Sequence, residues 1–142
     1  MANISQTPAS VAVGASTLKT EIVQYGEAVT QGQPLYKHTD SKYYRCDAND
    51  GIAKANCSRI ALTAGATDGY GLVAIPGTTA GKALVNLGAT LVVGELYAVS
   101  ATVGAIAPIA DITSTQFPTT LGFAVSAALL DFQVTVCTVA KA

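Results

Sequence analysis

Short segments in which apolar and polar residues alternate run along most of the chain from residue 21 onward, with turn-forming residues between them. A period of two places successive side chains on opposite faces, which is the pattern of a half-buried β-strand. In residues 131–139 (DFQVTVCTV), for example, Phe132, Val134 and Val136 share one face. The same pattern predicts strands at residues 21–25, 34–38, 42–46, 58–65, 70–77, 91–93, 96–100, 122–127 and 131–139.

Helix signals are weak by comparison. Asp50 precedes a segment that fits one helical turn up to Cys57, and residues 79–87 fit another, but neither has a sustained apolar stripe. Many short strands separated by turns predict an all-β fold. We expect a small antiparallel barrel or sandwich, in which residues 21–142 form a single β domain and residues 1–20 form an extended N-terminal arm.

A glycine-framed motif occurs twice, as GEAVTQGQPLY (residues 26–36) and more loosely as GATLVVGELY (residues 88–97). Glycine tolerates positive φ, so Gly26 and Gly32 allow tight turns on either side of a strand of two or three residues centred on Val29. The repetition predicts an architectural device that the chain uses twice.

The first 20 residues (MANISQTPASVAVGASTLKT) are small and polar, with sparse apolar side chains. We expect an arm that is ordered where it lies on a partner, and the alternation around Ala12 favours an arm that pairs as a strand. A frayed terminus is the alternative. The predicted partner contacts in this arm are Ile4, Val11, Val13 and Leu18.

Tyrosines cluster in the predicted hairpin around residues 39–41. They could stack on sugar rings or on a partner chain, although aromatic cross-strand pairs also stabilise sheets without binding a ligand. Leu35 and Tyr36 should point to opposite faces, and we expect Tyr36 to be structural. Tyr43 and Tyr44 are the predicted partner contacts.

Charged residues make up only 12% of the chain, against roughly 25% in an ordinary soluble domain. Eleven of them lie at or before Arg59, and six follow. The C-terminal part therefore exposes small uncharged side chains, which suits permanent contact with other chains, and we expect an oligomer. A monomer with a threonine-rich surface is the alternative. The net charge of -1 gives no basis for binding nucleic acid or a membrane, and we expect neither as a partner.

The sequence lacks the residue spacing of known catalytic and metal sites. His38 is the only histidine, so a Ser-His-Asp arrangement has no other candidate. GTTAGKA (residues 77–83) has three residues between its glycines, where a phosphate-binding loop has four, and no hydroxyl residue follows Lys82. DANDG (residues 47–51) is typical of a solvated turn, although calcium would tolerate its carboxylates. We expect no enzymatic activity, no cofactor and no metal.

Three cysteines, Cys46, Cys57 and Cys137, form an odd set without C-x-x-C spacing. The first residues lack the basic and apolar regions of a secretory signal, which predicts synthesis and retention in a reducing compartment. We therefore expect the three cysteines to be reduced and to act as small buried hydrophobic residues.

GEAVTQGQPL resembles the Gly-x-x-Val-x-x-Gly-x-x-Leu hinge of biotinyl and lipoyl carrier domains. Such carriers display a modified lysine at a hairpin tip, typically beside Met or Asp. Neither Lys37 nor Lys42 lies in that context, and the chain is longer than a carrier needs.

Residues 26 to about 135 resemble the small decoration, or cement, proteins of tailed-phage capsids. The matching features, in order, are GEAVTQGQPLY, a short polar hairpin, ANCSRIALTAGATDGYGLVAIPG, LVVGELYAVSATVGAIAPIADI and TTLGFAVSAALLDFQV. The resemblance implies an all-β fold, frequent trimerisation and binding to the outer face of an assembled capsid, without enzymatic activity.

On this resemblance we expect a structural virion protein that is made in the host cytoplasm and binds the major capsid protein as a homotrimer. When three contacts are linked in one trimer, the first contact raises the effective concentration for the others, so the overall affinity exceeds that of a single contact. The arm over residues 2–20 would add strands to exposed edges of the capsid protein. The alternative is a trimeric head-fibre or adhesin module that binds a host glycan through Tyr43 and Tyr44.

Overall fold

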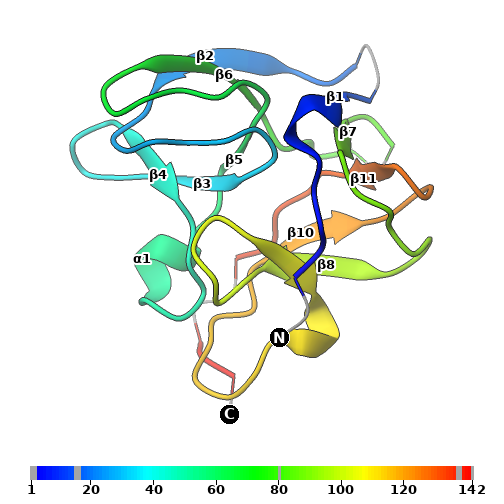
Figure 1. Ribbon diagram of the computed structural model, residues 1–142. Helices are drawn as coiled ribbons and strands as arrows, with labels where there is room; N and C mark the ends of the chain where they lie inside the picture. The colour runs from blue at the N-terminus through cyan, green and yellow to red at the C-terminus, as the bar shows by residue number, and fades with distance from the viewer. Residues whose placement is uncertain (1–2, 15–16, 80, 137–138, 142) are drawn as a thin grey trace.

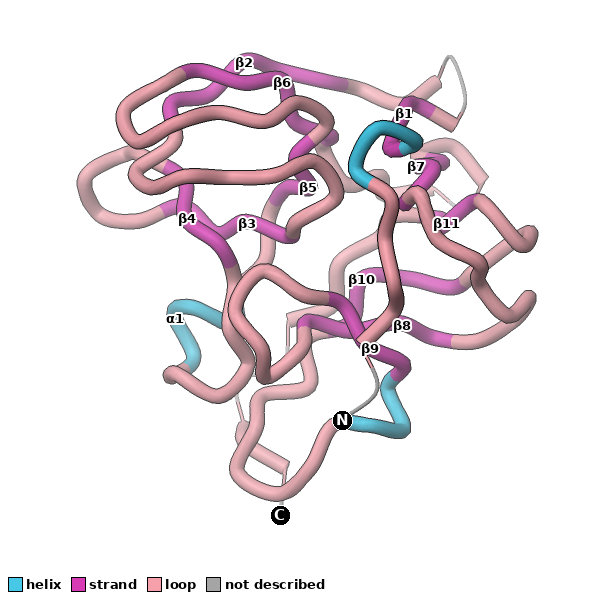
Figure 2. Tube along the Cα trace, viewed as in Figure 1, coloured by secondary structure: helices cyan, strands magenta, loops and turns pink. Residues whose placement is uncertain are grey.

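Strands and loops make up nearly all of the structure, a computed structural model (Figure 1). It describes residues 3–14, 17–79, 81–136 and 139–141. Within these residues, helix is limited to one turn of α-helix, α1 (Ile52–Ala55), and two 3-10 turns, η1 (Pro8–Ser10) and η2 (Ile109–Asp111). The strands form three antiparallel sheets in a sandwich-like arrangement, without a closed barrel (Figure 2). The expected all-β fold is confirmed.

The largest sheet has five strands, in the order β2 (Thr20–Gln24), β6 (Tyr70–Ala74), β5 (Arg59–Ala61), β3 (Pro34–Lys37) and β4 (Tyr43–Arg45). All neighbouring strands are antiparallel. Two of these pairs are the hairpins that the sequence predicts. Ser41 turns between β3 and β4 with a φ of 68°, and Asp68 turns between β5 and β6 with a φ of 63°. The edges of this sheet are β2 and β4.

Two smaller sheets complete the fold. One has the order β1 (Val11–Val13), β7 (Leu84–Leu87) and β11 (Leu129–Asp131), and the other has the order β10 (Thr120–Phe123), β8 (Leu96–Val99) and β9 (Ile106–Pro108). In Figure 1 they lie to the right of the five-stranded sheet and below it. Their strands come mostly from the charge-poor C-terminal part of the chain.

Both faces of the five-stranded sheet bury apolar side chains. Leu35 and Tyr36 are neighbours in β3 but belong to different clusters, because successive strand residues point to opposite faces, as predicted. The main cluster lies between this sheet and the two smaller ones, and its fully buried members include Leu87, Ile106 and Phe132. The second cluster is smaller and consists of Val23, Tyr25, Val29, Leu35, Tyr43, Ala61 and Val73.

The loop over residues 26–32 (GEAVTQG) covers the second cluster. Val29 is 3% exposed and exchanges two backbone hydrogen bonds with Gly65, at 2.9 and 3.0 Å. The short strand predicted around Val29 is therefore reduced to a single bridge. The motif closes the open face of the sheet.

The glycines of the repeated motif serve two different purposes. Gly32 has the expected positive φ of 87°, and in the second copy Gly88 and Gly94 have φ of 68° and 84°. Gly26 has no positive φ, so the prediction for this residue is wrong. The ring of Tyr44 lies where a Cβ at Gly26 would be, so close approach requires a glycine there.

The N-terminal segment lies on its own domain instead of extending away from it, as the dark blue trace of Figure 1 shows. The backbone N–H of Ile4 donates to Ile106 O at 2.9 Å, and β1 pairs with β7. Val11 and Leu18 are 6% and 7% exposed and belong to the main cluster. The prediction that the alternation around Ala12 forms a strand is confirmed, and the partner strand is in the same chain.

One helix assignment and one strand assignment in the C-terminal part are wrong. Residues 79–87, which carry a weak helix signal, contain strand β7, and residues 91–93 lead into a turn. The sequence does not predict strand β9. Its three residues end in a proline and follow small residues, so they show no apolar alternation.

The strand predicted over residues 131–139 ends after Asp131. Beyond that point Phe132 donates its N–H to Ala83 O at 2.8 Å, and Gln133 donates to Leu121 O at 2.9 Å. The segment thus crosses from one small sheet to the other, and the buried Phe132 fills the space between them. Residues 137–138, which include Cys137, lie outside the described residues.

Cys46 and Cys57 are free thiols with exposed fractions of 0% and 2%, which confirms the prediction for both. Burial raises the pKa of the Cys46 thiol well above its ordinary value, and a hydrogen bond with Cys57 raises it further. These sulfurs act as apolar core atoms.

The fully buried ring of Tyr25 lies between two glycines. A Cβ at Gly65 would stand 2.5 Å from Tyr25 Cδ2, and a Cβ at Gly71 would overlap the hydroxyl end of the ring. The Tyr25 hydroxyl donates to Thr63 O at 2.8 Å, so the ring is held from moving away.

We expect Gly71→Ala to lower the free energy of unfolding by about 1–3 kcal/mol, because an added methyl forces the held ring of Tyr25 out of its place. Chemical denaturation measures this change. Ala12→Val, which enlarges an exposed strand residue, is the control and should stay within about 0.5 kcal/mol. Equal losses in the two variants would contradict the role of Gly71.

Candidate functional site

The six predicted contact residues do not form one surface. Val11, Leu18 and Tyr43 are less than 10% exposed and contact the chain's own core, so in this structure they cannot meet a partner. Ile4 and Tyr44 are partly buried against the main cluster. Val13, at 46%, is the exposed member of the set.

Tyr43 points into the second cluster, and the guanidinium carbon of Arg59 lies 5.9 Å from the centroid of its ring. Its neighbour Tyr44 points to the opposite face, because the two are successive residues of β4. The two tyrosines are adjacent in the sequence, but their side chains lie on opposite faces of the sheet.

Tyr44 belongs to a cluster of rings on the β3–β4 hairpin. Its ring stacks on Tyr36 with a centroid distance of 6.0 Å and meets His38 edge-on at 5.2 Å. The Tyr44 hydroxyl donates to Asp40 Oδ2 at 2.6 Å, across the turn. These contacts fit the structural role expected of Tyr36, and they extend it to Tyr44.

The hydrogen bond between Tyr44 and Asp40 affects both groups. Chiefly because Asp40 accepts the hydroxyl proton, the pKa of Tyr44 is raised to about 12. The same bond, followed by that from the Lys42 N–H, lowers the pKa of Asp40.

A polar pocket of about 370 Å³ lies beside these rings. Four of its charged side chains form two ion pairs: Arg45 Nη2 donates to Glu27 Oε1 at 3.0 Å, and Lys54 pairs with Asp50. Asp47 accepts a hydrogen bond from the Asn49 N–H at 2.9 Å. The first pair ties β4 to the loop over residues 26–32. The described residues contain no group of His, Cys, Asp and Glu side chains that fits a metal ion. Most of the side chains that line the pocket thus contact one another.

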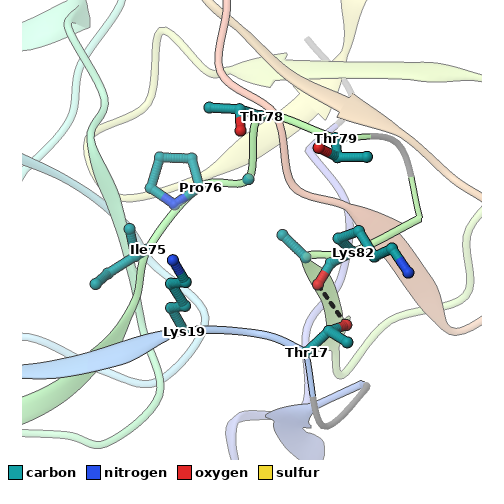
Figure 3. A pocket seen from close by; sticks show the side chains of 9 residues that line it. Thr17, Lys19, Ile75, Pro76, Thr78, Thr79 and Lys82 are labelled. Atoms are coloured by element: carbon teal, nitrogen blue, oxygen red, sulfur yellow. Dashed lines mark hydrogen bonds between the residues drawn. The ribbon is translucent and has the colours of Figure 1, made fainter.

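A second pocket, of about 280 Å³, includes the GTTAGKA loop (Figure 3). Lys19 points towards Ile75 and Pro76, whereas Lys82 points away, so the two cations do not converge. The backbone N–H of Gly81 donates to Asp131 Oδ2 at 2.9 Å. The carboxylate of Asp131 thus occupies one backbone donor of this loop.

Four exposed apolar side chains lie on two neighbouring stretches of chain, the segment before β8 and the end of β10 with the segment after it. They are 62%, 65%, 54% and 45% exposed, in the order Val92, Val93, Phe123 and Val125. We call these four residues the apolar face. Lone exposed apolar residues are normal on a protein surface, but a contiguous group marks an interaction site.

Backbone hydrogen bonds bring these residues together. Leu91 N–H donates to Ala127 O, and Gly94 N–H donates to Ala124 O, both at 2.8 Å. Leu91 and Ala124 belong to the main cluster, whereas their chain neighbours Val92, Phe123 and Val125 are exposed. In Figure 1 these two segments form the loops at the right-hand end of β8 and β10.

A groove of about 390 Å³ continues the apolar face along β10. Phe123 belongs to both, and the other lining residues are Leu96, Thr120, Gly122, Asp131, Gln133 and Thr135. Within residues 84–130, which supply the face and most of the groove, Glu95 and Asp111 are the only charged residues. Asp131 is the one charged residue among those that line the groove.

The sequence signals this surface only in part. The scarcity of charge after Arg59 predicts an uncharged surface, but residues 122–127 are apolar in both phases of the alternation. The pattern therefore does not tell which of Phe123 and Ala124 points outward.

No family model, no curated protein and no solved structure matches the chain. Within the described residues, no helix has the length and hydropathy needed to cross a bilayer. The resemblance to capsid decoration proteins therefore stays an expectation.

We expect a phenol titration of the folded protein to show a late transition near pH 12, and Tyr44→Phe to remove it, because the bond to Asp40 retains the proton. Since the folded pKa lies above the ordinary value of 10.0, the contribution of this bond to stability is present below pH 10 and is lost towards pH 12. Absorbance at alkaline pH measures the transition. Tyr70→Phe, at the most exposed tyrosine, should keep it; its loss there would refute the assignment.

Proposed function

We propose that the chain is a structural protein that binds other protein chains through the apolar face, and that it decorates the outer surface of a tailed-phage capsid. The observation that carries the proposal is the apolar face itself, which is exposed and lies in a part of the chain with almost no charge. Specific protein interfaces have apolar cores from which charged residues are depleted. The family resemblance supports the capsid as the partner.

In this proposal the apolar face is the contact between copies in a homotrimer. Three copies around one axis present three identical surfaces to the capsid, and each binding event raises the effective concentration of the next. Weak single contacts are thereby converted into firm occupancy. The major capsid proteins held together in this way resist the pressure of the packaged genome.

The N-terminal segment has a smaller part in this proposal than the sequence predicts. Deleting residues 2–20 would remove Val11 and Leu18 from the main cluster and strand β1 from its sheet, so the variant would lose stability along with any contact. Of the four predicted contacts in this segment, Val13 is exposed in β1 and can be changed without disturbing the core.

The alternative function, glycan binding through Tyr43 and Tyr44, has less support. Sugar recognition by aromatic residues needs open ring faces. Tyr43 is 7% exposed, and Tyr44 packs against Tyr36 and His38. A glycan array with the intact protein remains the direct test, and specific binding lost in Tyr44→Ala would favour this alternative.

We expect the double variant Val93→Lys/Phe123→Lys to abolish trimer formation and to reduce capsid occupancy at least tenfold, because three copies of each lysine would meet in an apolar interface. Native mass spectrometry measures the oligomer. Sedimentation with assembled capsids of the phage that encodes the chain measures the occupancy.

Ile52→Lys is the matched control for this experiment. Ile52 is 40% exposed in α1, outside the apolar face, so the added charge should change neither measurement. A wild-type protein that neither trimerises nor sediments with capsids would refute the proposal. A trimer that survives the double variant would move the interface elsewhere.

A further inference from the structure

Two buried thiols that contact each other are the feature that the proposed function leaves unused. Cys46 directly follows β4, and Cys57 comes two residues before β5; these two strands lie on opposite sides of β3 in the five-stranded sheet. Both cysteines belong to the main cluster, and their thiols are hydrogen bonded to each other. We call the segment between them, residues 47–56, the α1 loop.

The α1 loop brings the two cysteines together. The Asp47 N–H donates to Lys54 O at 2.9 Å, and the Cys57 N–H donates to Ala55 O, also at 2.9 Å. The first bond closes the base of the loop beside Cys46, and the second folds the chain into a γ-turn. In Figure 1 the α1 turn of this loop lies below β3 and β4. The backbone therefore sets the contact between the two thiols.

Backbone outside the α1 loop holds the same two residues. The Cys46 N–H donates to Pro34 O of β3, and Cys46 O accepts from the Gly104 N–H, both at 2.9 Å. Cys57 Sγ donates to Arg59 O of β5 at 3.3 Å. The middle of the loop can therefore move while both cysteines stay anchored to the sheet.

The middle of the α1 loop is weakly packed. Every residue from 49 to 53 is exposed. Gly51, with a φ of 89°, has no atom within 4 Å of the position that a Cβ would take. Segments with few buried contacts open locally at a low free-energy cost. We therefore expect the α1 loop to open, and to admit small molecules to the thiols, more readily than the strands of the sheet.

We propose that Cys46 and Cys57 are a site of oxidative modification, where a peroxide converts the two thiols into a reversible intramolecular disulfide. A disulfide forms without backbone movement only where two side chains already approach each other. A lone buried cysteine is an inert core residue, whereas here each thiol has a second thiol in reach. The first sulfur to be oxidised is therefore captured by its neighbour.

The reaction balances with hydrogen peroxide as the oxidant. One thiolate attacks an oxygen of the peroxide, the O–O bond breaks, and the sulfur becomes a sulfenic acid while hydroxide leaves. The second thiolate attacks the sulfenic sulfur, so that the S–S bond forms and the S–O bond breaks, which releases a second hydroxide. The protons given up by the two thiols convert both hydroxides into water. Two thiols are thus oxidised, and one peroxide is reduced.

Burial makes this oxidation slow and dependent on opening of the α1 loop. The two cysteines are 0% and 2% exposed, and burial raises the pKa of the Cys46 thiol, so little thiolate is present near neutral pH. The disulfide therefore accumulates with time in an oxidising solution and is absent in a reducing one. The inference goes beyond the proposed function, because it needs neither the apolar face nor a partner chain.

Peptide mapping of the unaltered protein tests the site. The folded protein is treated with hydrogen peroxide, its remaining thiols are alkylated, and it is digested with trypsin without a reductant. Trypsin cleaves after Arg45, Lys54 and Arg59, which puts the two cysteines in separate peptides, residues 46–54 and 55–59. We expect these peptides to be joined, with a mass lower by two hydrogen atoms than their sum, and to separate after reduction.

Other products would overturn the proposal. They are a link from either cysteine to Cys137, a link between two chains, and sulfinic or sulfonic acid in place of the disulfide. Thiols that an alkylating reagent labels but peroxide does not join would also overturn it. So would thiols that resist both reagents, because the α1 loop would then not admit an oxidant. Cys137→Ser is the matched control and should form the same link.

Chemical denaturation measures what the disulfide does to the fold. The bond links the edge strand β4 to β5 across β3 and restricts the unfolded chain, so we expect oxidation to raise the equilibrium constant for folding at least tenfold. Reduction with dithiothreitol should reverse the gain. Cys57→Ser cannot form the link and should show no gain after the same peroxide treatment. An oxidised protein that is no more stable than the reduced one would refute the stabilising role of the link.

The outcome is independent of the proposed function. Val93→Lys/Phe123→Lys alters the apolar face alone, so this variant should form the disulfide as the unaltered protein does. A disulfide that forms only in the protein with an intact apolar face would mean that association of copies brings the thiols together, and the intramolecular site would be wrong.

Discussion

Burial of both faces of the five-stranded sheet is the constraint on which the rest of the structure depends. A sheet of five short strands is stable only when apolar contacts cover it, and here Leu35 and Tyr36 require cover on opposite sides. The two smaller sheets supply the cover on one side. On the other side no sheet is present in the described part of the chain, and a single loop with Val29 at its centre takes that role. The glycines beneath Tyr25 follow from the same need, since they let a large ring lie flat on the strands.

The parts of the fold that can be predicted from the sequence are those set by local chemistry. Ser41 and Asp68 occupy turns that tolerate positive φ, and the strands beside them alternate cleanly, so both hairpins are found. β7 is different, because its pairing with β1 and β11 joins segments far apart in the chain. Strand propensity depends on such neighbours more than on the strand itself. The segment after Asp131 shows this limit of sequence-based prediction most clearly. The alternating pattern correctly predicts that Phe132 is buried, but the backbone there no longer belongs to strand β11.

The same reasoning explains why the predicted contact residues differ from the exposed ones. Val11 and Leu18 are apolar residues in a polar segment, a pattern that fits a partner contact and a core contact equally well. The domain buries them first, because intramolecular contact does not cost the entropy of association. The residues of the apolar face, by contrast, stay exposed in the folded domain. Ala124 is buried in the main cluster, and because successive strand residues point to opposite faces, Phe123 points outward.

The burial of Cys46 and Cys57 has a practical consequence for work with this molecule. A thiolate is the reactive form of cysteine, and burial holds Cys46 in the thiol form, out of reach of solvent. An alkylating reagent therefore reacts at Cys46 only in molecules whose sheet has opened near β4. The rate of that labelling therefore reports how often the native state opens spontaneously near β4. Mass spectrometry of the peptides measures it without denaturant and without an engineered probe.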